Sequence, residues 1–244
     1  KSYFFLFSIL IMGFFEDKYF YFIVLFVTAI YPLVQSFERR LKFYRSWIYL
    51  LPSLFVMMLI HIPIDILFTK IGIWEFNNEL IYGIFIFNLP IEEWLFFMII
   101  PFSCIFIYQV LKYFFTIPKP SKEIFRITFF FGVTLMLLAL YFYDHIYTSV
   151  YFGILGLSLI IINTIKPIWW SDFLFMYAVS LIPFLLINGL LTGSFTNQAA
   201  VIYNEAEIIG LRILNIPVED TIYSFEILLT TVWCYEYFKK KFSF

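Results

Sequence analysis

The sequence predicts an all-α integral membrane protein, built as two parallel three-helix repeats joined by a linking helix. Composition is the first observation behind this prediction: 63% of the residues are hydrophobic and 14% are charged, whereas soluble domains carry about 25% charged residues. The second is that apolar runs of about 20 residues, enough to cross the hydrocarbon core of a bilayer, recur along the chain. The third is an internal repeat of the acidic motifs described below.

Seven candidate spans follow one another along the chain. They lie near residues 19–37, 46–67, 88–113, 124–143, 147–165, 171–191 and 213–238. The N-terminal stretch 3–15 is apolar but short, and it has three interpretations: a signal-like region, an interfacial segment or an eighth span. Because no small-residue cleavage site such as A-x-A precedes Glu16, we expect this stretch to be retained.

Lysine and arginine gather in alternate connections, and this bias predicts the orientation because cytoplasmic loops carry an excess of positive charge. The residues assigned to the cytoplasmic side are Arg39, Arg40, Lys42, Arg45, Lys112, Lys119, Lys122, Arg126, Lys166, Lys239, Lys240 and Lys241. Lys18, Lys70 and Arg212 fall on the opposite side, and Lys1 is unassigned. We therefore expect a multi-pass protein of the cell (inner) membrane with a cytoplasmic C-terminus.

An internal repeat relates residues 76–93 to residues 203–220. The matched positions share one offset of 127 residues: Asn77 and Asn204, Gly83 and Gly210, Asn88 and Asn215, Pro90 and Pro217, and Glu92 and Glu219. Four spans separate equivalent helices, so the repeats run in the same direction and a pseudo-two-fold axis lies along the membrane normal. The predicted parts are an N-terminal segment 1–18, a first repeat 19–115, a linker with a transmembrane helix 116–146 and a second repeat 147–240.

Each repeat contains an Asn-x-Pro pattern followed by two acids. These acids are Glu92, Glu93, Glu219 and Asp220. Asn is favoured at the N-cap, Pro in the first turn and acids near the positive end of the helix dipole, so one interpretation is a well-capped helix start. The surroundings favour function instead, because acids among apolar residues of a membrane helix are costly and usually functional. Capping alone does not require two acids in both copies.

Adjacent residues on a helix point about 100° apart, so Glu92 and Glu93 cannot face the same point. The duplication allows Glu92 and Glu219 to meet across the axis, or each to face its own end of a long substrate. Carboxyl groups kept away from water favour the neutral form, and one can donate a proton while an ionised partner accepts one. Asp65 and Arg212 either pair with these acids or face the membrane interface.

Aromatic residues are frequent, with 35 Phe, 18 Tyr and 6 Trp, and most are expected to face lipid or pack in the core. Some can line a cavity in which ring faces stabilise a carbocation. Trp94, Phe96 and Tyr223 are the candidates nearest the acids. Asn88 and Asn215 are candidates for polar contact with a substrate.

The sequence carries no motif for a metal or an organic cofactor. His61 and His145 lack metal-ligand spacing, and Cys104 and Cys234 lack the paired spacing of zinc or redox motifs. No GxGxxG, P-loop or HExxH pattern occurs, and the net charge of −1 offers no basic field for nucleic acid. We therefore expect no cofactor, no metal and no nucleic-acid partner, and we interpret the cysteines as small core residues.

Three segments resemble the fused, duplicated lycopene cyclase domain family of bacteria, archaea and fungi: IFNLPIEEWLFF (86–97), GSFTNQAAVIYNEAE (193–207) and IPVEDTIYSF (216–225). The segment SFERRLKFYRSW (36–47) resembles the family's first cytoplasmic loop. The resemblance extends over about residues 19–240. It implies a membrane-bound, flavin-independent isomerase of carotenoid biosynthesis, a lycopene β-cyclase that forms β-carotene through γ-carotene.

The resemblance also implies the substrates and the surroundings of the site. Lycopene and γ-carotene would come from the bilayer through a lateral opening, with membrane lipid around the protein, and association with other carotenoid enzymes is left open. Combined with the motif geometry, this leads to the hypothesis that Glu92 and Glu219 are the principal acid or base, with Glu93 and Asp220 as partners. We favour one composite site over two independent sites. The alternatives are a small parallel-repeat transporter or a noncatalytic membrane subunit.

Overall fold

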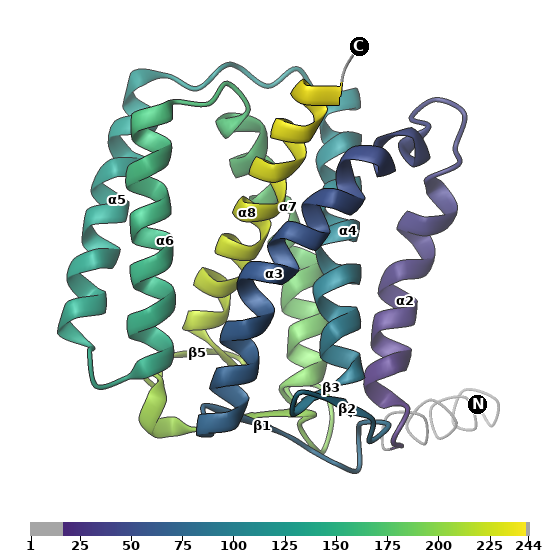
Figure 1. Ribbon diagram of the computed structural model, residues 1–244, viewed down its shortest axis with the longest axis vertical. Helices are drawn as coiled ribbons and strands as arrows, with labels where there is room; N and C mark the ends of the chain where they lie inside the picture. The colour runs from purple at the N-terminus through teal and green to yellow at the C-terminus, as the bar shows by residue number, and fades with distance from the viewer. Residues whose placement is uncertain (1–16, 243–244) are drawn as a thin grey trace, which may run out of the picture.

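The computed structural model describes residues 17–242, which form seven α-helices and a few short strands (Figure 1). The helices are α2 (Phe20–Gln35), α3 (Trp47–Ile71), α4 (Ile91–Phe114), α5 (Lys122–Tyr141), α6 (Ile146–Ile165), α7 (Trp170–Leu191) and α8 (Val218–Phe242). The strands are β1 (Trp74–Phe76), β2 (Phe85–Ile86), β3 (Leu89–Pro90), β4 (Val201–Tyr203), β5 (Arg212–Ile213) and β6 (Ile216–Pro217). Single 3-10 turns cover Phe43–Ser46 and Glu205–Glu207. The predicted apolar stretch 3–15 lies outside the described residues.

Five of the described helices are long and apolar enough to cross a membrane: α3 with the turn before it, α4, α5, α6 and α7. Helix α2 is apolar but has 16 residues, or about 24 Å at 1.5 Å per residue, which is shorter than a hydrocarbon core of about 30 Å. Helix α8 has 25 residues but is less apolar, because it contains buried acids along its length. The fold is therefore a helical membrane protein, as predicted.

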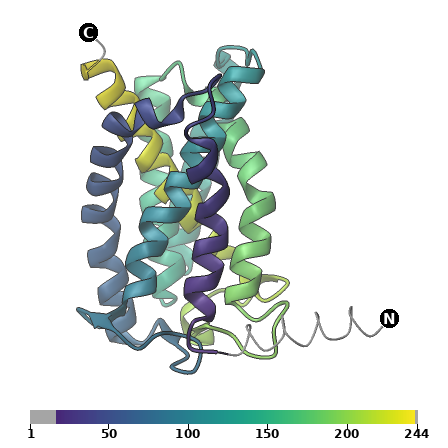
Figure 2. The same cartoon turned by 90° about the vertical axis from the view of Figure 1, so that its right-hand side faces the viewer.

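Consecutive helices alternate in direction along the long axis of the molecule (Figures 1 and 2). One end of the molecule holds the last turn of α8 and the connections 36–46, 115–121 and 166–169 (Figure 1). The other end holds the strand-bearing connections before α4 and α8. Helix α8 runs through the middle and packs against α3, α4, α6 and α7, while α5 contacts mainly α6. At the basic end, Lys112 Nζ lies 3.1 Å from carboxyl oxygens of both Asp172 and Glu236, which ties α4, α7 and α8 together.

Short antiparallel strands occur in the connections, which the all-α prediction did not include. Strands β1 and β4 pair across the repeats, with Trp74 opposite Tyr203. The pairs β2–β3 and β5–β6 are hairpins directly before α4 and α8. Phe87 and Asn88 have φ of 52° and 66°, which suits a two-residue hairpin turn. This turn delays the start of α4. The N-cap of α4 is therefore Pro90, whereas the capping interpretation of the sequence placed Asn88 there.

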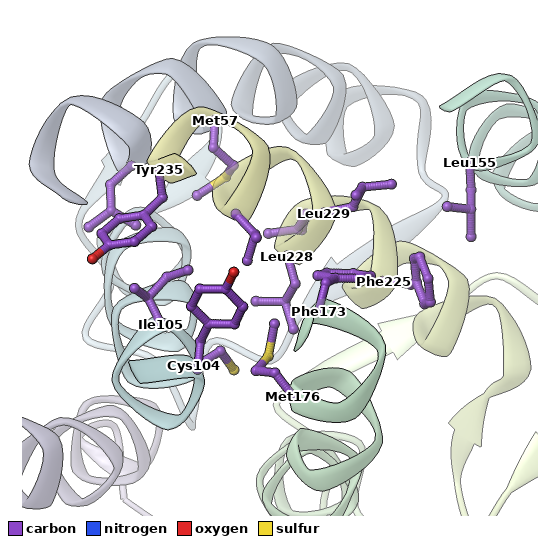
Figure 3. Close-up of a cluster of buried hydrophobic side chains, with 14 of the residues drawn as sticks. Met57, Cys104, Ile105, Leu155, Phe173, Met176, Phe225, Leu228, Leu229 and Tyr235 are labelled. Carbon is purple, nitrogen blue, oxygen red and sulfur yellow. The ribbon is translucent and has the colours of Figure 1, made fainter. Parts of the chain in front are cut away.

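The main apolar core lies where α8 meets α3, α4 and α7 (Figure 3). Its central side chains include Met57, Cys104, Ile105, Phe173, Met176, Phe225, Leu228, Leu229 and Tyr235. Cys104 is a free, buried thiol within this core, which confirms its interpretation as a small core residue. Cys234 is also a free thiol and is partly exposed. A second cluster, rich in aromatic residues, joins α2, α3 and α6 to the strand-bearing connections.

Helices α5 and α6 approach each other at two glycines, and this contact generates a stability prediction. A methyl group added at Gly156 would lie 2.9 Å from the Gly132 carbonyl oxygen, whereas one added at Gly153 meets only Ala139, at 3.8 Å. We expect Gly156→Ala to lower the free energy of unfolding by about 1–3 kcal/mol, the usual cost of overpacking. Gly153→Ala, the control on the same helix, should be neutral or stabilising by up to about 1 kcal/mol. Thermal unfolding of the detergent-solubilised variants measures both, and equal effects would contradict the close approach.

Candidate functional site

Three carboxylic acids from three helices line one small cavity next to the β1–β4 strand pair. They are Asp65 of α3, Glu93 of α4 and Asp220 of α8. The cavity has a volume of about 60 Å³, and their residue exposures are 2%, 7% and 3%. The sequence predicts Glu93 and Asp220 as partners in the site and allows two interpretations of Asp65. The structure supports the first of these, because Asp65 lies with the motif acids.

The two motif acids in the cavity differ in the number of hydrogen bonds that they accept. Glu93 Oε1 accepts one bond, from Tyr21 Oη at 2.6 Å. Asp220 accepts three: from Tyr147 Oη at 2.7 Å, Asn188 Nδ2 at 2.6 Å and Tyr203 Oη at 2.8 Å. Burial, followed by the charge of the adjoining Asp220, raises the pKa of Tyr203 well above its ordinary value, so this phenol remains a donor. Hydrogen bonds to a carboxylate favour its ionised form, and Asp220 is therefore the better stabilised anion.

Glu92 and Glu219 perform a different task in the fold. Each is fully buried, and each accepts a backbone N–H bond from the connection before its helix. Tyr82 donates to Glu92 Oε1 at 2.6 Å, and Ile209 donates to Glu219 Oε1 at 2.7 Å. The next residues, Gly83 and Gly210, have φ of 89° and 82°, a backbone conformation that glycine adopts without strain. The first acid of each pair thus anchors a connection of the same shape in both copies.

The adjacent acids therefore point in different directions, as the helix geometry predicts. The second acid of each pair faces the cavity, and the first faces its own connection. Among the described residues that line the cavity, Glu92 and Glu219 do not occur. Their second oxygens are buried without a hydrogen-bond partner in the described part of the chain. The geometry brings Glu93 and Asp220 together instead, one from each copy of the motif.

The other predicted substrate contacts separate into two groups. Phe96 and Tyr223 line the cavity. Trp94 instead directs its Nε1 toward the Ile86 carbonyl oxygen, at 3.4 Å. Asn88 and Asn215 lie in exposed hairpin turns, and Asn215 Nδ2 donates to the Gly193 carbonyl oxygen at 3.0 Å. Asn215 thus ties its hairpin turn to the connection after α7, and Asn88 has the positive φ of a turn residue.

Several residues of the site were not selected from the sequence. The tyrosines that donate to the acids are Tyr21, Tyr147 and Tyr203. A signal was present for the first two, because they are separated by 126 residues and so fall close to the offset of the repeat. Arg212 was expected either to pair with the motif acids or to face the membrane interface. It forms an ion pair with Glu205, which is not one of the motif acids. Within residues 17–242, no cluster of His, Cys, Asp and Glu with the geometry of a metal site is found.

Aromatic rings surround the three acids. Trp74, Tyr147, Tyr203, Tyr223, Phe96 and Phe97 all line the cavity. The Trp74 and Tyr147 ring centroids are 5.2 Å apart, and Tyr147 stacks on Tyr203 with centroids 6.1 Å apart. Ring faces attract a nearby cation, and the attraction strengthens where water is excluded. The site thus combines carboxyl groups that can exchange protons with a lining that stabilises positive charge.

A larger apolar groove adjoins this cavity. Its volume is about 510 Å³, and residues of α2, α4, α7 and α8 line it. The groove and the cavity share six lining residues: Phe96, Ile100, Phe184, Asn188, Ser224 and Leu228. The acids therefore lie at the inner end of an apolar space formed between helices, a suitable arrangement for a long hydrocarbon ligand.

Comparison with known families identifies both copies of the motif. Residues 18–111 and 144–238 each match the family model described as Lycopene cyclase. The first match contains Glu92 and Glu93, and the second contains Glu219 and Asp220. No curated protein and no solved structure matches the chain.

The anchoring role of Glu219 can be tested through stability. Its Oε1 accepts from both the Ile209 backbone and Thr148 Oγ1, the latter at 2.7 Å. Glu219→Gln keeps an acceptor oxygen, so we expect a change of less than about 1 kcal/mol in the free energy of unfolding. Glu219→Leu leaves two buried donors unpaired and should cost about 2–5 kcal/mol. Thermal unfolding and limited proteolysis of the 192–217 connection measure the difference, and equal stability of the two variants would exclude the anchoring role.

Proposed function

Because the chain belongs to the lycopene cyclase family, we propose that it is a lycopene β-cyclase, an isomerase that closes the ψ-ends of lycopene into β-ionone rings. The product sequence is lycopene, γ-carotene and β-carotene. The observation that carries this proposal is the pair Glu93 and Asp220, which line one aromatic cavity at the end of an apolar groove. The reaction needs an acid, a base and protection of a carbocation, and these groups supply all three.

In each ring closure the substrate gains one proton from an acid and loses one proton to a base. The acid protonates C2 of the terminal double bond, which leaves a tertiary cation at C1. The C5–C6 double bond attacks C1, the new ring carries the charge at C5, and a base removes the proton from C6. No oxidant or reductant is consumed, so the chemistry requires only proton exchange at fixed positions. This balance agrees with the expectation that the reaction needs no flavin or nicotinamide.

We assign Glu93 as the acid and Asp220 as the base. Three donors favour the ionised form of Asp220, whereas Glu93 accepts, among residues 17–242, only from Tyr21 and can carry its own proton on the other oxygen. The repeat explains this asymmetry in part. Tyr203, a donor to Asp220, corresponds at the 127-residue offset to Phe76, which has no hydroxyl group for Glu93. Unequal surroundings of this kind separate the roles of paired carboxyl groups.

The aromatic lining supports the intermediate stage of the reaction. A carbocation in contact with water would be captured as an alcohol, so the site must exclude water from the ring that forms. The acids line a small cavity of about 60 Å³, and a substrate end that enters it would displace water from the acids. The ring faces of Trp74 and Tyr223 then take over the stabilisation of positive charge.

The groove between α2, α4 and α7 is the proposed path of the polyene chain. Its lining is apolar, and it joins the cavity through shared side chains such as Phe96 and Phe184. A substrate dissolved in the bilayer can enter sideways between these helices, with its ψ-end toward Glu93. A single composite site then serves both ends of lycopene, because the half-cyclised product leaves and returns with its other end first.

The membrane arrangement that fits this function has seven spans, with α2 and α8 included. Two parallel three-helix repeats, α2–α4 and α6–α8, are joined by α5. The basic connections and the C-terminus face the cytoplasm of the cell (inner) membrane, so the strand-bearing connections cover the acids from the opposite side. Both acid motifs lie in the first helical turn after a hairpin, and this shared local structure supports a layout in which the two motifs have the same depth.

The acids give the most direct test. Glu93→Gln and Asp220→Asn keep side-chain shape but remove proton exchange, so each should lower ring closure at least about 10²-fold. Pigment analysis in lycopene-producing bacteria measures ring closure in cells. Assays of the purified protein with lycopene, without added flavin, measure it directly. Glu92→Gln and Glu219→Gln are matched controls that keep an acceptor for their connections, and they should retain much more activity.

Three results would contradict parts of this proposal. Unchanged lycopene with the wild-type chain, despite verified membrane insertion, would exclude the cyclase. A larger loss in the Glu92 and Glu219 variants than in the Glu93 and Asp220 variants would move the chemistry to the other acid of each pair. Accumulation of γ-carotene in both Glu93→Gln and Asp220→Asn would indicate two independent sites, each able to close one ring.

The groove generates a separate prediction. Ile187 lines it, whereas Ile182 on the same helix is 67% exposed on the outer surface. Ile187→Trp should obstruct the polyene path and lower kcat/KM at least about fivefold, which corresponds to a rise of about 1 kcal/mol in the activation free energy. Ile182→Trp should leave the rate nearly unchanged. Initial rates with lycopene in vesicles compare the two, and equal rates would rule out this groove as the path.

A further inference from the structure

Asp65 is the third acid of the cavity, and the two proton transfers described above do not use it. It lies on α3, is 2% exposed and lines the same space as Glu93 and Asp220. Tyr223 lines the cavity with it. The Asp65 Oδ2 atom is buried without a hydrogen-bond partner in the described part of the chain. Buried polar atoms are nearly always paired, so an unpaired carboxylate oxygen beside two other acids requires an explanation.

Other unpaired polar atoms lie along the same helix interface, behind Asp65. His61 Nδ1, Tyr151 Oη and Glu226 Oε2 are also buried without a partner in residues 17–242. Tyr151 packs on Tyr223 with ring centroids 4.6 Å apart, and His61 stacks on Tyr151 at 6.3 Å. Asp65 is thus positioned between the cavity and a polar strip formed by α3, α6 and α8. This setting suits a group that gains and loses a proton more than one held in a single ionisation state.

The proposed reaction creates a need for such a group. After one ring closure Glu93 has lost its proton and Asp220 has gained one, so neither is ready for the next ring. The proton must travel from Asp220 back to Glu93 before the enzyme can act again. The cavity is small and apolar on most of its lining, which makes bulk water a poor carrier. A carboxyl group that lines the same space as both acids provides a direct route.

We propose that Asp65 returns the proton from Asp220 to Glu93 between ring closures. This inference rests on the proposed function and adds a third acid to it. The Asp65 carboxylate accepts the proton from neutral Asp220 and then passes it to the Glu93 carboxylate. Asp220 is left ionised, Glu93 is left neutral and Asp65 returns to its starting form, so the cycle is balanced without an added reactant. Glu226 does not line the cavity and so lacks direct access to either acid.

Pre-steady-state kinetics distinguish proton return from the other roles of an acid. Wild-type protein, Asp65→Asn, Asp65→Glu and the exposed control Asp144→Asn are each mixed with excess lycopene in vesicles, and rings formed per protein are counted over time. Asp65→Asn should close about one ring at the wild-type rate and then slow at least about 10²-fold in the steady state. Asp65→Glu, which keeps a carboxyl group, should recover much of the steady-state rate. Asp144→Asn should match the wild-type protein in both phases.

The outcomes separate this inference from the proposed function. A slow first ring in both Asp65→Asn and Asp65→Glu would overturn it, because Asp65 would then act in ring closure or in holding the fold. Unchanged steady-state turnover of Asp65→Asn would overturn it as well. If wild-type protein formed no ring at all, the proposed function would fail first and the inference with it. A normal first ring in Asp65→Asn also demonstrates that this variant is folded.

Discussion

The need to satisfy carboxyl groups that are buried among apolar helices organises the site end of this molecule. A carboxyl group removed from water is costly unless donors surround it. Glu92 and Glu219 meet this need with backbone N–H groups of the connections before their helices, and so the connections are held against the helix ends. Glu93 and Asp220 recruit tyrosine hydroxyls from α2 and α6. The same bonds that lower the cost of burial thus position both the connections and the first helix of each repeat.

Duplication supplies two similar motifs, and small differences between them separate their roles. The hairpins, the glycines with positive φ and the anchoring acids occur in both copies at one offset. The donors differ, because Asp220 has Asn188 and Tyr203 in addition to its tyrosine from α6. The first copy contributes Asp65 on α3 to the shared cavity instead. Two copies joined at one cavity therefore give its two motif acids unequal surroundings, as the proposed acid and base roles require.

Much of the fold could be predicted from the sequence, because apolar runs determine where helices lie in a membrane protein. The repeat and the two acid pairs were also visible in the pattern of residues. The direction of each acid was not, since it depends on where the helix starts, and one residue of displacement rotates a side chain by about 100°. The hairpin turn at Phe87 and Asn88 determines that start. Asp65 was ambiguous because a single acid in an apolar span has no local partner, and only packing brings α3 against α4 and α8.

The least apolar helix occupies the middle of the bundle, and this arrangement resolves a conflict between chemistry and membrane insertion. Helix α8 contains Asp220 and Glu226, which would be costly if they faced lipid. Its neighbours α3, α4, α6 and α7 cover it, while α5 exposes large apolar side chains such as Ile127 and Leu140, at 68% and 70%. The large apolar side chains of α5 thus lie on the outside of the bundle, whereas Asp220 and Glu226 lie on α8, which is not among the five long apolar helices. Asp65 of α3 and Glu93 of α4 face the same interior as Asp220, so even the strongly apolar helices turn their acids toward α8 and keep them buried within the bundle.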